Sequence, residues 1–140
     1  MEKVKFYFEE EKVKPYKKHH NDAGWDLKSK TDTILYPGET KIIPTGVTTE
    51  IPKGYVGIVK PRSSWGAKGI DVTAGVIDSD YRGEIGVVIQ NHADKPLAIT
   101  KGERIAQILV VPVLLEAEFE EGKAPKNTAR GAGGFGSTGK

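Results

Sequence analysis

An apolar run leads into a polar corner, and a second leads out of it, in Ala74-Gly75-Val76-Ile77-Asp78-Ser79-Asp80-Tyr81-Arg82-Gly83-Glu84, which Ile85-Gly86-Val87-Val88-Ile89 follows. Two short apolar runs joined by a turn are typical of a β-hairpin. We therefore predict strands at residues 74–77 and 85–89, with an acidic and aromatic tip between them.

The tip of this hairpin allows two interpretations. A carboxylate fixed at the end of a strand, such as Asp78, can serve as a general base, and Tyr81 can form a flat wall for a ring-shaped substrate. Alternatively, Asp78 caps backbone donors in an ordinary polar turn, and Tyr81 only packs. This stretch alone leaves both interpretations open.

Similar short strands are predicted on both sides of the hairpin, separated by glycine and proline turns about every 8–12 residues. Their ranges are 4–8, 25–27, 33–35, 41–43, 47–50, 55–60, 70–72, 97–99 and 105–111, with a last short strand at Phe119. Residues 63–68 predict one helical turn with Ser63 near its N-cap. We expect an all-β single domain, a sandwich, jelly roll or barrel.

Composition excludes several functional classes. The net charge of +2, from 21 basic and 19 acidic residues, is nearly balanced, so we expect no nucleic-acid partner. No apolar run approaches the roughly 20 residues that span a bilayer, and no signal-peptide core follows Met1, so we expect no membrane partner. The absence of cysteine excludes thiol chemistry. A soluble, cytoplasmic protein is expected.

The end of the chain differs in composition from the rest. Small and basic residues dominate residues 122–140, and Phe135 is the only large apolar residue there. Such a segment cannot bury enough surface to fold alone. We therefore divide the chain into a β domain, residues 1–121, and a flexible glycine-rich arm, residues 122–140, which a ligand or a neighbouring subunit would order.

The arm also allows two interpretations. Its glycines let backbone N–H groups converge on phosphate oxygens, and Arg130, Ser137 and Thr138 add further donors. Phe135 is suited to closing over a flat ring. The alternative is a disordered tail without a ligand.

Three further places carry groups suited to a nucleotide. Arg62, Ser63 and Ser64 follow Pro61 and offer donors to an anion, although a helix cap with an arginine ion pair explains them equally well. Asp22 and Asp26 are carboxylates of the kind that support a hydrated Mg²⁺. Gln107 lies within an apolar run and needs a hydrogen-bond partner if it points inward.

Together these stretches resemble the trimeric deoxyuridine triphosphate nucleotidohydrolases (dUTPases). The five motifs of that family occur here in order, as Ala23-Gly24-Trp25-Asp26-Leu27, Pro61-Arg62-Ser63-Ser64, Gly75-Val76-Ile77-Asp78-Ser79-Asp80-Tyr81-Arg82-Gly83-Glu84, Gly102-Glu103-Arg104-Ile105-Ala106-Gln107 and Arg130-Gly131-Ala132-Gly133-Gly134-Phe135-Gly136-Ser137-Thr138-Gly139. The resemblance implies a jelly-roll, β-clip-like subunit in a homotrimer with active sites shared between chains. It also implies Mg²⁺-dependent hydrolysis of dUTP to dUMP and pyrophosphate, in the cytoplasm or, for a viral protein, in the host cell interior.

The resemblance assigns roles to residues of this sequence. Asp78 would be the general base, Tyr81 would lie against the deoxyribose, and the backbone around Gly75 would bind the uracil edge. Asp26 would hold Mg²⁺ through a water molecule, the metal being bound mainly by the triphosphate. Phe135 would stack on uracil. The remaining substrate-binding residues, which would hold the phosphates, are Arg62, Ser63, Ser64, Gln107, Arg130, Gly136, Ser137 and Thr138.

Two departures keep alternatives open. Trp25 and Ser64 stand where the family often has other residues, and the related dCTP deaminases also carry an Arg-Ser-Ser segment. A deaminase needs a glutamate acting on the base ring, and Glu84 is the nearby candidate. The other alternative is a non-catalytic, regulatory binding protein on the same fold.

Overall fold

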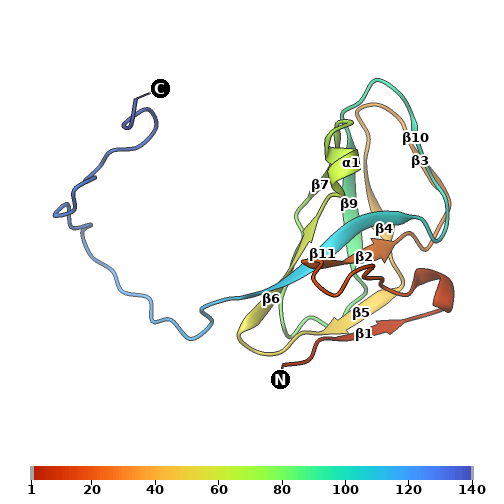
Figure 1. Ribbon diagram of the computed structural model, residues 1–140, viewed down its shortest axis with the longest axis horizontal. Helices are drawn as coiled ribbons and strands as arrows, with labels where there is room; N and C mark the ends of the chain where they lie inside the picture. Colours follow the sequence, from red (N-terminus) through yellow and green to blue (C-terminus); the bar gives the residue numbers. More distant parts are fainter. Residues whose placement is uncertain (1, 140) are drawn as a thin grey trace.

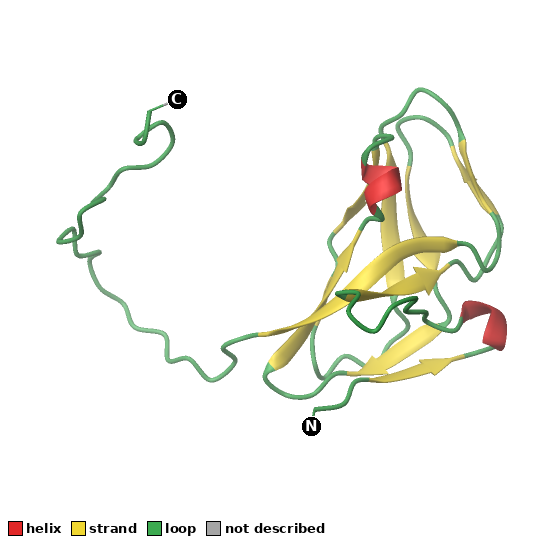
Figure 2. Cartoon of the chain, viewed as in Figure 1, coloured by secondary structure: helices red, strands yellow, loops and turns green. Residues whose placement is uncertain are grey.

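Short strands make up nearly all the regular structure of residues 2–139, which are the residues that the computed structural model describes (Figures 1 and 2). Lys140, the last residue of the predicted arm, lies outside them. Within residues 2–139 the helical segments are η1 (Glu11–Val13) and α1 (Ser63–Gly66). The strands are β1 (Lys5–Phe8), β2 (Gly24–Lys28), β3 (Thr33–Leu35), β4 (Thr40–Pro44), β5 (Val47–Glu50), β6 (Tyr55–Lys60), β7 (Ile70–Thr73), β8 (Val76–Ile77), β9 (Gly86–Asn91), β10 (Leu97–Ile99) and β11 (Arg104–Pro112).

Two antiparallel sheets form the body of the molecule. One has the strand order β4-β9-β7 and the other β2-β11-β6-β8, while β1 pairs with β5 and β3 with β10. In Figure 1, β11 and β2 cross in front of β9 and β4. The prediction of an all-β, jelly-roll type of fold is confirmed.

The core lies between these sheets because apolar side chains alternate along the strands. In β9, Val87 and Ile89 are fully buried while their neighbours are only half-buried. Leu27 of β2 and Ile108 of β11 face the same cluster from the other sheet. Each such side chain contributes about 1.5–3 kcal/mol by leaving water.

The predicted pairing of residues 74–77 with residues 85–89 is wrong, and the strand that pairs with β9 is β7, which ends just before residue 74. β7 pairs with β9 antiparallel, with Thr73 opposite Val88. Beyond Thr73 the chain leaves this ladder, and β8 pairs with β6 instead. Ala74 and Gly75, with φ of 58° and 91°, cause the departure, because a left-handed backbone cannot continue a strand.

The predicted helical turn is present as α1, and Ser63 is its first residue, directly after the N-cap Arg62, whose side chain forms no capping hydrogen bond. One smaller prediction is wrong. Phe119 lies in no strand: it is 90% exposed, and in residues 2–139 the strands end at Pro112. Phe119 stands between glutamates and has no partner strand to cover it.

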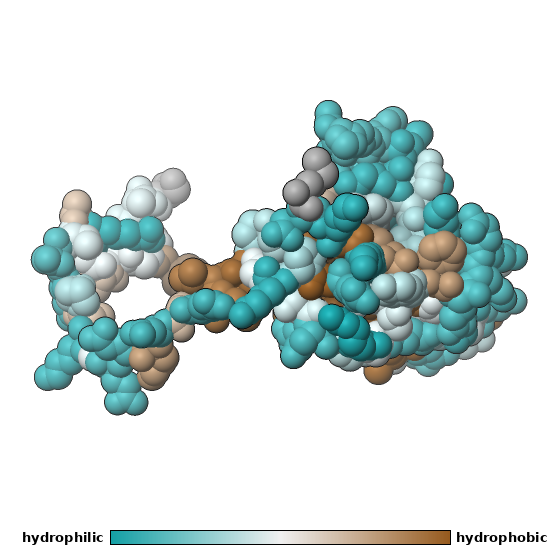
Figure 3. All heavy atoms as spheres, turned by 90° about the horizontal axis from the view of Figure 1, so that it is seen from below, coloured by the Kyte–Doolittle hydropathy of each residue, from teal (hydrophilic) through white to brown (hydrophobic). Residues whose placement is uncertain are grey.

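The chain leads away from the body after β11 (Figure 1). Val113 donates its N–H to the carbonyl of Gly54 at 2.9 Å, and beyond this point the side chains are exposed. Hydrophobic surface gathers at the base of this segment (Figure 3), where Leu114 and Leu115 are 81% and 52% exposed. Farther along, Arg130 Nε donates to the carbonyl of Gly133 at 2.6 Å, a contact within the segment. No helix in residues 2–139 has the length and apolar character needed to cross a membrane.

Candidate functional site

A hollow of about 170 Å³ opens between the two arms of the predicted hairpin. Continuing the β7–β9 ladder past Thr73 and Val88 would place Val76 opposite Ile85 and Ile77 opposite Glu84. These residues instead line the hollow, whose full lining is Val76, Ile77, Asp78, Tyr81, Glu84, Ile85 and Gly86. The hollow therefore occupies the space where backbone pairing between the two arms is missing. Backbone N–H and C=O groups need partners, which a planar ligand carrying donors and acceptors can supply.

Tyr81 forms one wall of this hollow, and its ring is held in place. Its hydroxyl donates to the carbonyl of Glu84 at 2.8 Å, and its backbone N–H donates to the carbonyl of Asp78 at 3.1 Å. The ring lies directly over Gly83, where an added Cβ would be 2.6 Å from the ring carbon Cζ. Glycine at position 83 is therefore required by the packing of Tyr81 against the backbone.

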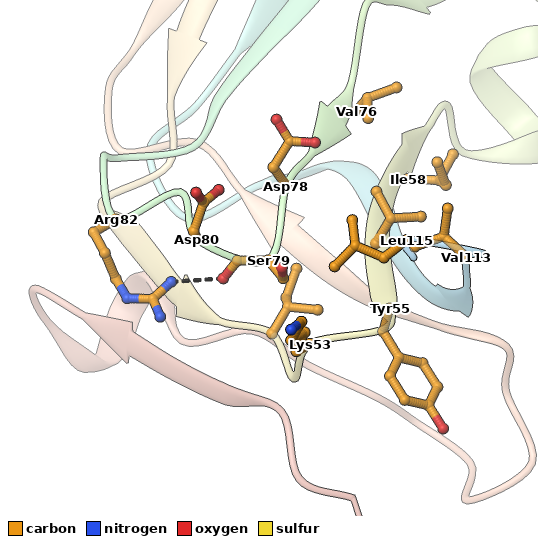
Figure 4. Close-up of a pocket in the computed structure, with 12 residues that line it drawn as sticks. Lys53, Tyr55, Ile58, Val76, Asp78, Ser79, Asp80, Arg82, Val113 and Leu115 are labelled. Atoms are coloured by element: carbon orange, nitrogen blue, oxygen red, sulfur yellow. Dashed lines mark hydrogen bonds between the residues drawn. The ribbon is translucent and has the colours of Figure 1, made fainter. Parts of the chain in front are cut away.

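Asp78 lies at the rim of two hollows. It directly follows β8, it is exposed, and it also lines a larger hollow of about 620 Å³ (Figure 4). Asp80 and Arg82 line only the larger hollow, and Arg82 Nη1 donates to the carbonyl of Ser79 at 2.7 Å, which holds the turn. Asp78 is thus the carboxylate shared by both spaces.

A second cluster of polar groups lies across β2 and β11 beside the end of β6. The pairing register puts Asp26, Gln107 and Lys60 in one row across the sheet. Gln107 is half-buried, and its Nε2 donates to the carbonyl of Pro61 at 3.3 Å, which provides the partner that the sequence required. Arg62 Nη1 donates to the carbonyl of Arg104 at 3.3 Å. The first, second and fourth of the five motifs, which contain Asp26, Arg62 and Gln107, thus meet here.

The two serines next to Arg62 lie at the start of α1. Ser63 and Ser64 are both exposed, and Arg62 precedes them as the N-cap. The start of α1 lies near Gln107, because the carbonyl of Pro61 accepts the hydrogen bond from Gln107. The arrangement offers a guanidinium, an amide and two hydroxyls to an anion.

Asp26 is the carboxylate in this cluster. Its side chain is 27% exposed and lies 3.8 Å from Nη1 of Arg104. Asp22, the other acidic candidate, accepts a hydrogen bond from the backbone N–H of His19 at 2.9 Å and so belongs to the loop. Residues 2–139 contain no group of three or more His, Cys, Asp or Glu side chains suited to holding a metal. A single carboxylate fits Mg²⁺ that keeps its waters and is bound mainly by phosphates.

One chain keeps the two clusters apart. Asp78 follows Ile77, which pairs with Gly57, whereas Gln107 pairs with Lys60 on the other side of β6. A strand spacing of about 4.8 Å and a rise of about 3.3 Å per residue separate Asp78 and Gln107 by roughly 16 Å. The predicted arm residues Arg130, Phe135, Gly136, Ser137 and Thr138 are all exposed and lie away from both clusters (Figure 1).

Lys30 braces the turn and was not predicted from the sequence. Its Nζ contacts Glu9 Oε1 at 2.9 Å and Glu84 Oε1 at 3.4 Å. The hydrogen bond to Glu9, followed by that to Glu84, raises the pKa of Lys30 above its ordinary value. Partners 21 and 54 residues away leave no local signal in the sequence. The role of Gly83, in contrast, has a local signal, because Gly83 lies two residues after Tyr81 in the sequence Tyr81-Arg82-Gly83.

Comparison with known proteins shows one family throughout. The family model described as dUTPase matches residues 10–139. The deoxyuridine 5'-triphosphate nucleotidohydrolase of Clostridium tetani is 43% identical over 141 residues, covering 99% of this chain and 96% of the relative. That of Nautilia profundicola is 52% identical over 121 residues, covering 84% of each chain.

Solved structures show the same fold. The dUTPase of Staphylococcus bacteriophage 80alpha, a G164S mutant with dUpNHpp, superposes with a TM-score of 0.88 at 28% identity, covering 99% of both chains. The native EIAV dUTPase gives a TM-score of 0.77 at 26% identity, covering 88% of this chain and 99% of the other. A further structure, from phage phi11 of S. aureus, is described with a structural Mg(II) ion.

Proposed function

Because the chain belongs to the dUTPase family and is a dUTP diphosphatase, we propose that it hydrolyses dUTP to dUMP and pyrophosphate with Asp78 as general base. The observation that carries this assignment of roles is the unpaired hairpin. Its hollow is lined by two chain segments that do not pair with each other, by a tyrosine ring held by its hydroxyl and by one exposed carboxylate. The hollow can take a base, the ring can take a sugar, and the carboxylate can activate a water molecule.

The base and sugar would be recognised by different parts of this hollow. Backbone groups of Val76–Asp78 and Glu84–Gly86, which line the hollow, would pair with the edge of uracil and would be left unpaired by cytosine. A site of this kind can reject the wrong base by about 10⁴-fold. The Tyr81 ring, fixed by Glu84 and Gly83, would lie against the deoxyribose and leave no room for a 2′-hydroxyl.

Hydrolysis is a displacement at the α-phosphorus. Asp78 accepts a proton from water as the water oxygen forms a bond to this phosphorus. The bond from the α-phosphorus to the oxygen that bridges to the β-phosphate breaks, and pyrophosphate leaves with that oxygen. The exposed position of Asp78 at the rim of the hollow gives such a water access to the carboxylate.

The phosphates would be held by the second cluster. Arg62, Ser63, Ser64 and Gln107 supply donors to negative oxygens, and charge-assisted bonds of this kind are roughly twice as strong as neutral ones. Asp26 would hold Mg²⁺ through a water molecule. When bound, the metal neutralises developing charge on the phosphate oxygens.

A homotrimer explains how the two clusters serve one substrate. Asp78 and Gln107 of one chain are roughly 16 Å apart by strand geometry. A single chain therefore cannot place the general base, Asp78, beside its own phosphate donors. A neighbouring copy would supply the Arg62–Gln107 cluster. A third would supply the arm, whose Phe135 would stack on uracil while Arg130, Gly136, Ser137 and Thr138 complete the phosphate contacts.

The two alternative functions are not favoured. The family model and the curated relatives are all of the dUTP-hydrolysing type. The side chain of Glu84, the glutamate that a deaminase would need, contacts Lys30. A regulatory binding protein needs no intact catalytic carboxylate, whereas Asp78 is present and exposed.

A direct assay tests the proposal. Purified protein is incubated with dUTP and Mg²⁺, and dUMP, pyrophosphate and ammonia are measured separately. Pyrophosphate release from dUTP, with neither pyrophosphate nor ammonia from dCTP, is the expected result. Ammonia from dCTP would instead establish a deaminase, and no turnover of either nucleotide would reject the enzyme assignment. Light scattering of the same sample, with three times the chain mass expected, tests the trimer.

A further inference from the structure

The corner at Ala74 and Gly75 decides whether the base-sized hollow exists. Both residues have left-handed backbones, and within residues 2–139 Ala74 is the residue other than glycine with a positive φ. An L-residue in this region carries a steric cost. Ala74 is exposed, so no burial of its side chain offsets that cost. A strained residue without a packing reason, beside a candidate site, points to a functional one.

An extended backbone at Ala74 would close the hollow. The β7–β9 ladder is intact as far as Thr73 and Val88, and its register, if continued, pairs Val76 with Ile85. The corner instead turns β8 onto β6, where the carbonyl of Gly75 accepts a hydrogen bond of 2.8 Å from the N–H of Val59. A closed hairpin would exchange this β8–β6 pairing for an extension of the β7–β9 ladder, and the conformation of Ala74 and Gly75 selects between the two.

The two residues of the corner are constrained differently. A Cβ at Gly75 would lie 2.8 Å from the backbone oxygen of Val59, so only glycine fits there. Ala74 is exposed. A second glycine at position 74 would remove the strain, because glycine adopts a positive φ without a steric cost. The surrounding structure therefore holds Ala74 in the left-handed region against its own backbone preference.

We propose that Ala74 is a positioning residue that holds the hairpin open. Its left-handed backbone directs β8 onto β6 and so keeps Val76–Asp78 apart from Glu84–Gly86 before a base arrives. The inference rests on the proposed dUTP site and deepens it. It makes base recognition depend on a residue that touches neither the base nor the phosphates.

Three substitutions separate this role from a structural one. Ala74→Val introduces a β-branched residue that favours the extended conformation, whereas Ala74→Asn introduces a residue that tolerates the left-handed one. Ala98→Val is the matched control, because Ala98 is an exposed alanine in the extended backbone of β10. Steady-state kinetics with dUTP and dCTP, and melting curves, are recorded for each variant and for the wild type.

The expected result is a change in KM and in base discrimination. If Ala74→Val closes nine-tenths of the molecules, the KM for dUTP rises about tenfold while kcat changes little. Ala74→Asn should stay close to the wild type, and Ala98→Val should be unchanged. Equal KM values for Ala74→Val and Ala98→Val overturn the proposal, as does a loss of stability without a change in KM.

Hydrogen exchange of residues 74–86 provides a readout that does not depend on turnover. In the ligand-free wild type the amides that face the hollow should exchange quickly, whereas in Ala74→Val the closed ladder should protect them. The amide of Ile85, which donates to the carbonyl of Val47 at 2.8 Å, is protected in the wild type and serves as the internal reference. Equal exchange overturns the role of Ala74 even if the enzyme assay succeeds. Conversely, a wild type that does not hydrolyse dUTP rejects the proposed function but leaves the exchange result interpretable.

A fourth variant covers failure of the valine protein to fold. Ala74→Gly adopts the left-handed conformation without a steric cost, so the hairpin should stay open and its KM for dUTP should stay at or below the wild-type value. A KM of the glycine variant well above the wild-type value overturns the proposal.

Discussion

The backbone N–H of Tyr81 donates a hydrogen bond of 3.1 Å to the carbonyl of Asp78, so one turn fixes both the aromatic wall and the carboxylate. The two side chains line the same hollow. A change in either side chain can therefore be tested without moving the other.

Asp78→Asn should reduce kcat by about 10²–10⁴, the usual contribution of a general base, and leave nucleotide binding largely intact. The amide is similar in size to the carboxylate but cannot accept the proton. Asp80→Asn is the matched control, since Asp80 lies in the same turn and does not line the smaller hollow. Calorimetry with a non-hydrolysable dUTP analogue separates binding from turnover. Normal turnover by Asp78→Asn would remove Asp78 as the base.

Gly83→Ala should displace the Tyr81 ring, because the new Cβ would lie 2.6 Å from Cζ of the ring. We expect kcat/KM for dUTP to fall about tenfold or more, because a small displacement of the substrate from its reactive position lowers the rate by that much. Discrimination against UTP should also weaken. Tyr81→Phe, which removes only the hydroxyl bonded to Glu84, is the milder comparison. Unchanged sugar discrimination in Gly83→Ala would contradict the role given to Tyr81.

Removal of residues 130–140 should leave the fold intact and the activity severely reduced. The hydrogen bonds of Arg130 and its neighbours are local to the arm, so the melting temperature should not change. Activity should fall by about 10²-fold or more, the cost of losing positioned donors. Full activity of the truncated protein would show that the arm plays no part in catalysis.

Asp26→Asn should raise the Mg²⁺ concentration needed for half-maximal activity by about tenfold, the effect typical of a group that holds a metal indirectly. Asp22→Asn is the control, because Asp22 is engaged by the His19 backbone. Titrations of both variants with Mg²⁺ at fixed dUTP give the comparison. Equal shifts in the two variants would place the metal elsewhere.

Lys30→Met should lower the melting temperature by no more than a few degrees, because its ion pairs with Glu9 and Glu84 are partly exposed. The pKa of Lys30 is raised from 10.5 chiefly by the hydrogen bond to Glu9. Its stabilising effect is therefore complete below 10.5 and is lost as the pH rises through the raised pKa. The difference in melting temperature should accordingly shrink at alkaline pH. A difference that grows with pH would contradict the ion-pair explanation.

Much of the fold could be predicted because its signals are local. Short runs bounded by glycine and proline turns predicted strands at residues 47–50 and 55–60, which are the limits of β5 and β6. The five motifs likewise gave the family. The roles of the individual motif residues remain predictions. One chain brings together Asp26, Arg62 and Gln107 but keeps Asp78 apart from them, so a single chain does not form the whole site.

The remaining features could not be predicted, for physical reasons. The sign of φ at Ala74 is not encoded in an apolar run, so the sequence suggested a closed hairpin where the structure has a hollow. The contact between Lys30 and Glu84 joins residues 54 positions apart. Phe119 was assigned to a strand from its side chain alone, although no neighbouring strand covers it.

The short length of β8 has a consequence for solubility. A strand edge that must stay unpaired to bind a base is also an edge to which a foreign strand can add, the usual start of aggregation in β proteins. β8 has only two residues, Val76 and Ile77, with a left-handed corner before it and the acidic Asp78 and Asp80 after it. The exposed edge is thus long enough for a small ring and too short and too charged for another chain to extend the sheet.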